Sequence, residues 1–300
     1  MQICKKIDVH AHAVLNDQYE YKLNIRITPE MLLDLYDRVD VDYGILLPIV
    51  SPEGMTLVMP NGNTCAIAKQ HPDRFFWFCN IDPRMMPYNS AKTDYLPMLS
   101  FYKELGARGV GEMTSNLLAD DPRMENLFAQ CAEMDMPVTI HIAPSLGGYY
   151  GIVDELGLPR LTKLLKKYPK LKIFGHSQPF WAEIGDNVTE ENRFDYPTGK
   201  VHEGALARIM RECENLYLDM SAMSAYTAMT RDPDYSYRFI EEFGDRMMFG
   251  IDWSSPANRH LGKLNTFLDE GAQNGSISEK NYRAICRGNV IRLLNLPLES

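Results

Sequence analysis

Two histidines near the start of the chain, His10 and His12, lie two residues apart within an apolar segment that is typical of a β-strand (residues 3–12). Alternate side chains of a strand point to the same face, so the two imidazoles are expected side by side. Adjacent imidazoles fill a core poorly but bind a divalent metal ion well. The pair therefore indicates a metal site, although an H-x-H sequence alone also arises by chance.

Three further ionisable residues each stand at the end of a short apolar run: His141, His176 and Asp252. Burying such groups without partners costs free energy. If the runs are parallel strands of one barrel, their carboxyl ends meet at one mouth, where these side chains would converge. In the alternative, each histidine has its own hydrogen-bond partners in the core, which requires the same coincidence for four of the seven histidines. We therefore predict one shared metal site.

Glu112 is a sixth candidate ligand, because it lies in Gly109-Val110-Gly111-Glu112-Met113, at the end of the fourth strand-like run. The glycines beside it let other groups approach closely. The alternative is that this carboxylate pairs with Arg108 or with nearby surface lysines.

The elements that must position these residues alternate along the chain. Apolar, strand-like runs occur at residues 3–12, 43–48, 75–81, 107–113, 138–142, 171–176, 216–220 and 247–251. Helical patterns follow them at residues 29–39, 63–70, 91–105, 122–134, 157–168, 203–213, 234–243 and 259–274, with one more at 279–294. This alternation predicts a parallel sheet covered by helices.

Eight such units in 300 residues have the size of a (β/α)8 TIM barrel, which we predict as a single domain over residues 1–300. The long segments 143–156 and 177–201 follow strands, so they are expected to overhang the C-terminal face as βα loops. A doubly wound open sheet is the alternative fold, but no glycine-rich phosphate turn follows the first strand.

Composition limits the classes of partner and compartment. The chain has a formal net charge of −9 and 45% hydrophobic residues, so it is expected to fold and to avoid nucleic acids and anionic membranes. Its first residues show no secretory signal, and its six scattered cysteines contain no C-x-x-C pair. These features predict a cytoplasmic protein with buried free thiols.

The pattern as a whole resembles the amidohydrolase superfamily of metal-dependent TIM-barrel enzymes, and most closely the amidohydrolase-2 branch. The resemblance rests on the H-x-H pair, on the ionisable residues that end strands five, six and eight, and on two flanking patterns, His71-Pro72-Asp73-Arg74-Phe75 and residues 288–294. It covers nearly the whole chain. The branch contains hydrolases and also metal-dependent decarboxylases.

The resemblance implies roles for the individual residues. His10, His12 and Asp252 would bind a first metal ion, His141 and His176 would be further ligands, and Asp252 would accept a proton from the attacking water. A strand-four carboxylate such as Glu112 bridges two ions in some relatives. Zn²⁺ suits nitrogen and carboxylate ligands, but manganese is also compatible with them. Either one or two ions fit the charge of the ligands, and with one ion His176 would be free to move a proton.

Three functions follow from these expectations. The first is hydrolysis of a small lactone, ester or amide by metal-activated water, with Asp252 as general base. The second is non-oxidative decarboxylation of an aromatic or unsaturated carboxylic acid. The third is a binding barrel without catalysis, against which the intact ligand set argues. Glu112 favours hydrolysis, because it supplies a further ligand for activating water.

Residues on the predicted loops are candidates for contact with the small-molecule substrate. Arg84 could hold a carboxylate, and four aromatic residues could line the pocket: Tyr149, Tyr150, Trp181 and Trp253. Barrels of this kind often pair, so a homodimer is a further expectation.

Overall fold

The computed structural model describes residues 4–15, 27–85, 89–257 and 262–299. Its main sheet runs in sequence order through eight parallel strands. These strands are β1 (Lys6–Ala11), β2 (Val41–Leu46), β3 (Phe75–Cys79), β4 (Ala107–Met113), β5 (Val138–Ala143), β7 (Ile173–His176), β8 (Leu216–Asp219) and β9 (Met247–Met248). A short extra strand, β6 (Ile152–Val153), pairs with β5.

Backbone hydrogen bonds between the first strand and the segment after the last strand close the sheet. The Val9 amide donates to the Phe249 carbonyl oxygen at 3.0 Å, and the Asp252 amide donates to the His10 carbonyl oxygen, also at 3.0 Å. The predicted parallel (β/α)8 barrel is therefore confirmed. The last strand is shorter than predicted, but residues 249–252 continue its course beside β1.

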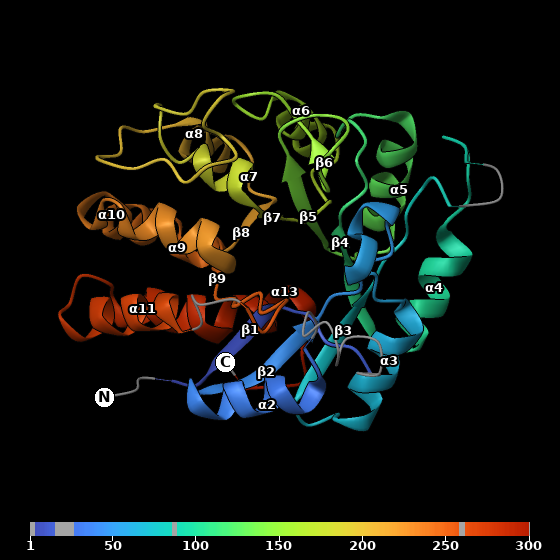
Figure 1. The fold of residues 1–300 in the computed structure, drawn as a ribbon, viewed down its shortest axis with the longest axis horizontal. Coiled ribbons are helices and arrows are strands. Elements are labelled where there is room, and N and C mark those ends of the chain that lie inside the picture. The colour runs from blue at the N-terminus through green and yellow to red at the C-terminus, as the bar shows by residue number, and fades with distance from the viewer. Residues whose placement is uncertain (1–3, 16–26, 86–88, 258–261, 300) are drawn as a thin grey trace.

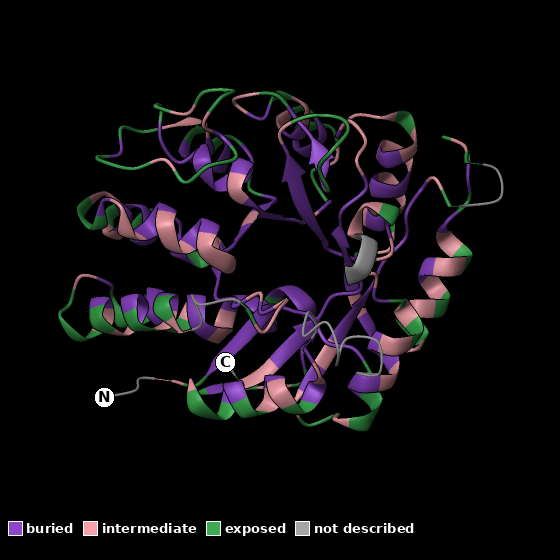
Figure 2. Cartoon of the chain, viewed as in Figure 1, coloured by how far each residue is buried: buried purple, intermediate pink, exposed green. Residues whose placement is uncertain are grey.

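Helices surround the strands, with their buried faces turned inward and their exposed faces outward (Figures 1 and 2). They are α2 (Pro29–Arg38), α3 (Asn61–Gln70), α4 (Leu96–Glu104), α5 (Pro122–Glu133), α6 (Pro159–Lys167), α7 (Gln178–Ala182), α8 (Ala205–Glu212), α9 (Ala222–Thr230), α10 (Pro233–Phe243), α11 (Lys263–Gln273), α12 (Glu279–Arg283) and α13 (Asn289–Leu294). Capping residues explain several starts: the Thr28 hydroxyl accepts the Met31 amide before α2, where Pro29 occupies the first turn.

Three features of the helices differ from the prediction. The predicted helix 279–294 is continuous but contains a π-helical turn, Ala284–Gly288, between α12 and α13. Helices α7 and α9 are additional, and α7 lies within the predicted loop 177–201. The sequence of α9 is mostly apolar or small, so it lacks the polar stripe from which an amphipathic helix is predicted.

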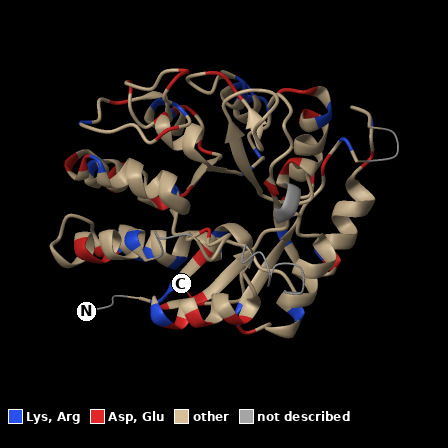
Figure 3. Cartoon of the chain, viewed as in Figure 1, with Lys and Arg blue, Asp and Glu red and all other residues tan. Residues whose placement is uncertain are grey.

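The core occupies the space between strands and helices, and a smaller apolar cluster brings together residues of β1, β2, β3, β7, β9 and α13. Charged residues of both signs are spread over the outer helices and loops (Figure 3). The six cysteines are free thiols, as predicted; five are buried and Cys4 is partly exposed. In the part of the chain that the structure describes, each helix is too short or too polar to cross a bilayer.

Candidate metal centre

The six residues predicted as metal ligands meet at the carboxyl ends of the strands. They come from five parts of the barrel wall: β1 and the residue after it, β4, β5, β7, and the segment after β9. Register places two of them in one row, because His141 of β5 pairs with His176 of β7. Three overlapping groups of these side chains, one including Asp219, have ligand atoms within 4.8 Å of one another.

The imidazoles of His10 and His12 are fixed so that one nitrogen of each faces the centre. His10 Nδ1 lies 2.6 Å from Asp219 Oδ2, and His12 Nδ1 lies 2.9 Å from the Leu47 carbonyl oxygen. Since both of these oxygens accept, the protons of the neutral rings belong on Nδ1, and the two Nε2 lone pairs face each other at 3.0 Å. Lone pairs at this distance repel unless a cation or a proton lies beside them, so the pair fits a divalent metal ion.

Glu112 lies between two sets of histidines. Its Oε2 is 3.6 Å from His10 Nε2 and 3.5 Å from His12 Nε2, whereas its Oε1 is 2.7 Å from His141 Nδ1. The buried Nε2 of His141 has no hydrogen-bond partner among the described residues. Each oxygen of this one carboxylate therefore serves a different set of potential ligands.

Asp252 completes the centre from the segment after β9. Its Oδ1 is 3.5 Å from His12 Nε2, and its Oδ2 is 3.6 Å from His176 Nε2. The other nitrogen of His176 lies 3.0 Å from the Ser221 hydroxyl. Asp252 has a φ of 54°, a left-handed conformation that is uncommon for a residue other than glycine. The carboxylate lies between the imidazoles of His12 and His176.

Asp219, at the end of β8, was missing from the predicted site. It is buried, bonds to His10 and lies 3.7 Å from His176 Nδ1. The signal that identified the other ligands, an ionisable residue ending an apolar run, applies equally to Asp219 in the predicted strand 216–220. Carboxylates that hold ligating imidazoles in this way orient the ring and increase its basicity.

The electrostatics of the site keep its carboxylates ionised. Burial would raise the pKa of Glu112, but His10 and the hydrogen bonds from three histidines hold this pKa well below its usual value. Burial would likewise raise the pKa of Asp252, but His10, His12 and His176 lower it to about 2. With Asp219, whose pKa is also lowered by His10 and His176 against the effect of burial, three negative charges meet here. One divalent ion would leave a net charge of −1, and two would leave +1.

Two glycines allow the strands and loops of the site to approach closely. A Cβ atom on Gly111, whose φ is +134°, would lie 2.6 Å from the Thr139 carbonyl oxygen of β5. A Cβ atom on Gly151, whose φ is +116°, would lie 2.7 Å from the His141 carbonyl oxygen. Larger residues would clash at both positions. The first glycine lets β4 bring Glu112 beside His141, and the second lets the loop fold over His141.

A small cavity of about 60 Å³ opens beside the predicted ligands. It is lined by His12, Ile49, Glu53, Gly54, Glu112, His141, Tyr150, Asp252 and Ser254. Of the residues predicted to contact substrate, Tyr150 lines this cavity, with its ring centroid 4.4 Å from that of His141. Tyr149, the next residue, packs instead against Phe194, with ring centroids 4.9 Å apart.

The other three predicted contact residues lie outside this lining. Trp181 is buried and its Nε1 donates to the Asp219 carbonyl oxygen at 3.0 Å, so it supports the strand end that holds His10. Trp253 is also buried. Arg84 donates to both oxygens of Glu53, at 2.5 and 2.6 Å, and to both oxygens of Asp82. Its guanidinium therefore holds Glu53, which lines the cavity, and is not directed at a substrate carboxylate.

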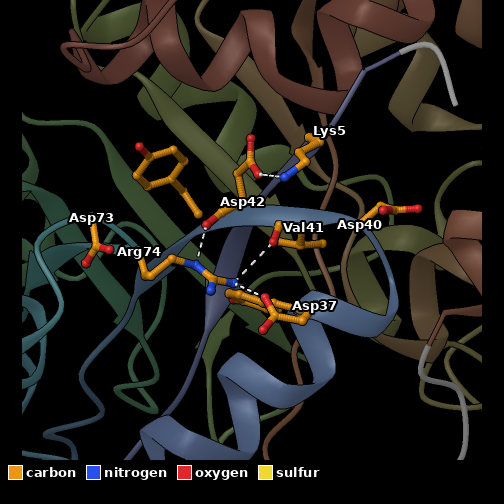
Figure 4. A pocket seen from close by; sticks show the side chains of 9 residues that line it. Lys5, Asp37, Asp40, Val41, Asp42, Asp73 and Arg74 are labelled. Atoms are coloured by element: carbon orange, nitrogen blue, oxygen red, sulfur yellow. Dashed lines mark hydrogen bonds and ion pairs between the residues drawn. The ribbon is translucent and has the colours of Figure 1, made fainter.

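A larger cavity of about 490 Å³ lies at the other end of the strands, where β1, β2 and β3 begin (Figure 4). Arg74 crosses it, donating to the carbonyl oxygens of Val41 and Asp42 and to the carboxylate of Asp37, and Lys5 pairs with Asp42. These hydrogen bonds and ion pairs connect the starts of β1, β2 and β3 to one another. They indicate a stabilising role, as expected for this face of a barrel.

Comparison with known proteins supports the resemblance. A family model described as Amidohydrolase matches residues 7–296. No curated protein matches. Solved structures with the same fold include an uncharacterised TIM-barrel protein from Bordetella bronchiseptica, with 17% identity, a TM-score of 0.64, and 97% of this chain and 98% of that chain covered.

Two further solved structures have descriptions that name an activity. One is a dihydroxybenzoic acid decarboxylase from Polaromonas sp. JS666 with bound manganese and the inhibitor 2-nitroresorcinol, with 19% identity, a TM-score of 0.61, and 99% and 98% of the two chains covered. The other is a probable 2-pyrone-4,6-dicarboxylic acid hydrolase from Acinetobacter baumannii with citric acid bound, with 14% identity, a TM-score of 0.57, and 97% and 100% covered. At these identities the likeness shows the barrel fold.

Proposed function

The chain belongs to the amidohydrolase family, and on this premise we propose that it is a metal-dependent hydrolase of a small lactone, ester or amide. The observation that carries the proposal is the position of Glu112, whose Oε2 faces His10 and His12 and whose Oε1 faces His141. A carboxylate shared in this way suits a pair of metal ions, which is a common arrangement for activating water in hydrolases.

The donor set assigns residues to each ion. His10, His12 and Asp252 would hold the first ion, His141 and His176 would hold the second, and Glu112 would be shared. We propose zinc, because imidazole and carboxylate suit it, and manganese as the alternative metal. When bound, such an ion lowers the pKa of water and polarises a carbonyl oxygen.

Asp252 is proposed as the residue that handles the proton. Its carboxylate is ionised at neutral pH because its pKa is about 2, and it lies at the cavity beside His12 and His176. It can therefore accept a proton from the attacking water and pass it to the leaving group. With a single ion bound, His176, whose Nε2 lies 3.6 Å from Asp252, would be free to offer a second position for that proton.

The described cavity wall offers no side-chain cation of its own to a substrate carboxylate. Among the described residues that line the cavity, none is lysine or arginine, while Glu53, Glu112 and Asp252 are acidic. Arg84, which reaches Glu53 in the cavity lining, is held by Glu53 and Asp82. A substrate carboxylate would therefore find no side-chain cation in the described wall and would have to be held by the metal ions themselves.

The test combines metal content with product analysis. The chain is stripped with a chelator, reloaded with Zn²⁺ or Mn²⁺, and assayed for acid release from lactones, esters and amides and for carbon dioxide release from hydroxybenzoic acids. We expect two ions per chain and acid release. The Glu112→Gln variant, which loses a shared charge but keeps the side-chain shape, should bind fewer ions and lose at least about a hundredfold in rate.

Decarboxylation is the second candidate, favoured by the Polaromonas structure, whose description names that activity. Carbon dioxide release without any hydrolysis would replace the first proposal with this one. A chain that binds no metal ion and shows neither activity would instead support the binding barrel. We also propose a homodimer, which light scattering of the metal-loaded protein would test.

A further inference from the structure

One asparagine side chain holds the loop that covers the candidate metal centre. The loop comprises residues 145–150, between β5 and β6, and all of them are exposed. Asn116 Oδ1 accepts the Gly147 amide at 2.6 Å. Asn116 Nδ2 donates to the carbonyl oxygens of Ser145, at 3.1 Å, and Gly151, at 3.2 Å. Among the described residues, the backbone of the loop forms its hydrogen bonds with this one side chain, so the path of the loop depends on Asn116.

The middle of the loop has room to move. Gly147 and Gly148 have φ angles of 78° and 76°, and a Cβ atom on either would meet no atom of the described chain within 4 Å. The aromatic side chains that follow make the other contacts of the loop: Tyr149 packs against Phe194, and Tyr150 packs against His141. A rotation of the backbone at the two glycines would therefore carry Tyr150 away from His141.

Asn116 is itself fixed from the side opposite the loop. Its backbone amide donates to Glu53 Oε1 at 3.4 Å, and Arg84 donates to both oxygens of Glu53. The hydroxyl of Ser115, the preceding residue, is buried and lies 3.1 Å from the hydroxyl of Ser51. Because Glu53 lines the cavity, Asn116 connects the exposed loop to the wall of the candidate metal centre.

The cavity beside the loop is too small for the substrates proposed above. Its volume is about 60 Å³, whereas pockets that enclose small-molecule ligands have volumes of about 300–1,000 Å³. Bound metal ions would fill part of this space. A substrate can therefore enter only if part of the wall moves. The loop is suited to this movement, because it carries Tyr150 of the cavity lining and its backbone is held by one side chain.

We propose that Asn116 is a positioning residue that holds residues 145–150 closed over the metal centre and releases them to admit a substrate. While its three hydrogen bonds are formed, Tyr150 covers His141 and the cavity is closed. When they break, the loop turns about Gly147 and Gly148 and the cavity opens. The inference rests on the proposed function for the nature of the substrate, but the movement of the loop can be measured without one.

The Asn116→Asp variant tests these hydrogen bonds with little change in side-chain shape. The carboxylate still accepts the Gly147 amide, but the two donated hydrogen bonds are replaced by an oxygen that faces two carbonyl oxygens and repels them. The matched control is Asn126→Asp on helix α5. Asn126 Nδ2 donates to the Thr93 carbonyl oxygen at 2.8 Å, so this control also loses a donated hydrogen bond, but away from the metal centre.

Amide hydrogen exchange and metal release measure the movement of the loop. In the Zn²⁺-loaded Asn116→Asp variant, the Gly147 and Gly151 amides should exchange about 10- to 100-fold faster than in the wild type, and a chelator should remove the metal faster by a similar factor. Asn126→Asp should match the wild type in both measurements. If Asn116→Asp does not fold, Asn116→Ala removes the same hydrogen bonds without adding a charge and should accelerate exchange in the same way.

Kinetics add a test on any compound that the chain hydrolyses. Asn116→Asp should raise KM by about 2- to 10-fold, the effect of losing the Tyr150 contact, and leave kcat nearly unchanged. If the chain binds no metal ion and hydrolyses nothing, the proposed function fails, but exchange at Gly147 and Gly151 still decides this inference. Unchanged exchange at both amides in the two Asn116 variants would overturn it, and so would an equal acceleration in Asn126→Asp.

Discussion

At the scale of single residues, His10 shows how a buried neighbour can determine which nitrogen of a ring is free to bind a metal. Asp219 Oδ2 accepts the Nδ1 proton at 2.6 Å and leaves Nε2 facing His12, Glu112 and Asp252. Burial alone would lower the pKa of His10, but the carboxylates of Asp219, Asp252 and Glu112 together raise it well above its ordinary value. When no metal ion is bound, the protonated ring of His10 therefore supplies a positive charge among Asp219, Asp252 and Glu112.

Replacing Asp219 should weaken metal binding without removing a predicted ligand. In Asp219→Asn the amide can donate to His10 Nδ1 and so move the ring proton to Nε2, the position that faces the ion. We expect a 10- to 100-fold loss of metal affinity, measured by competition with a chromophoric chelator. The exposed Asp234→Asn variant is the control and should keep wild-type affinity. Equal affinities in the two variants would show that Asp219 only packs against the ring.

Replacing Asp252 should instead remove the residue proposed to handle the proton. In Asp252→Asn the side chain keeps its size but can no longer accept a proton, so kcat should fall roughly 10²- to 10⁴-fold on any hydrolysed compound. Metal content and circular dichroism show whether ion binding and folding survive. A variant that keeps both its metal and its activity would assign proton transfer to another group, such as His176, whose Nε2 lies 3.6 Å from Asp252 Oδ2.

At the scale of elements, the loop between β5 and α6 presents two adjacent tyrosines in different surroundings. Tyr150 lies against His141 and lines the cavity, whereas Tyr149 contacts Phe194. Tyr150→Ala should lower kcat/KM by about 2- to 10-fold, corresponding to an aromatic contact of about 0.5–1.5 kcal/mol. Tyr149→Ala serves as the matched control and should change kcat/KM less. The reverse order would place the substrate against Phe194 rather than over His141.

The start of α6 depends on a carboxylate from the preceding loop. Asp154 is buried and accepts the backbone amides of Glu155, Arg160 and Leu161. Burial raises its pKa to about 6 despite these hydrogen bonds. The folded chain therefore holds the proton more tightly than the unfolded chain, whose ordinary aspartate pKa is about 3.9. The resulting stability is fully present below that value and is lost as the pH rises through 6.

Because the stability contributed by Asp154 falls as the pH rises, the free energy of unfolding should differ measurably between pH 5 and pH 7.5. Over that interval the free energy of unfolding of the wild type should fall by about 1.4 kcal/mol relative to Asp154→Asn, which has no carboxyl to titrate at this position. Urea unfolding at the two pH values measures the double difference. A difference that stays constant, or that grows with pH, would contradict the raised pKa.

The strands and the metal ligands could be predicted from the sequence because an ionisable residue near the end of an apolar run marks both a strand and a candidate ligand. Each of the six predicted ligands lies at or near the end of an apolar run, and in a parallel barrel that position alone brings them together. Arg84 had no such signal, because its partners are determined by tertiary structure: Glu53 lies 31 residues away in the chain. Trp181 likewise acts through a carbonyl oxygen 38 residues away, that of Asp219. Side chains on loops depend on such contacts, which periodicity does not encode.

At the scale of the whole molecule, the proposed ions would connect parts of the chain that are far apart in sequence. Ligands at both ends of the chain, His10 and Asp252, belong to one site, and the barrel closes beside them through the hydrogen bond from the Asp252 amide to the His10 carbonyl oxygen. The unfolded chain would not hold these groups together. The ions should therefore bind the native state and stabilise it by mass action.

Removing the metal should accordingly lower the melting temperature of the whole barrel. A free metal concentration 100 times the dissociation constant contributes about 2.7 kcal/mol, which for a chain of this size corresponds to a shift of about 5 °C. Differential scanning calorimetry before and after dialysis against a chelator, with the metal then restored, measures the shift. Asp234→Asn should show the full shift, and Glu112→Gln a smaller one, because it would hold fewer ions. A chain that binds ions with no change in melting temperature would place them on the surface, away from the residues that close the barrel.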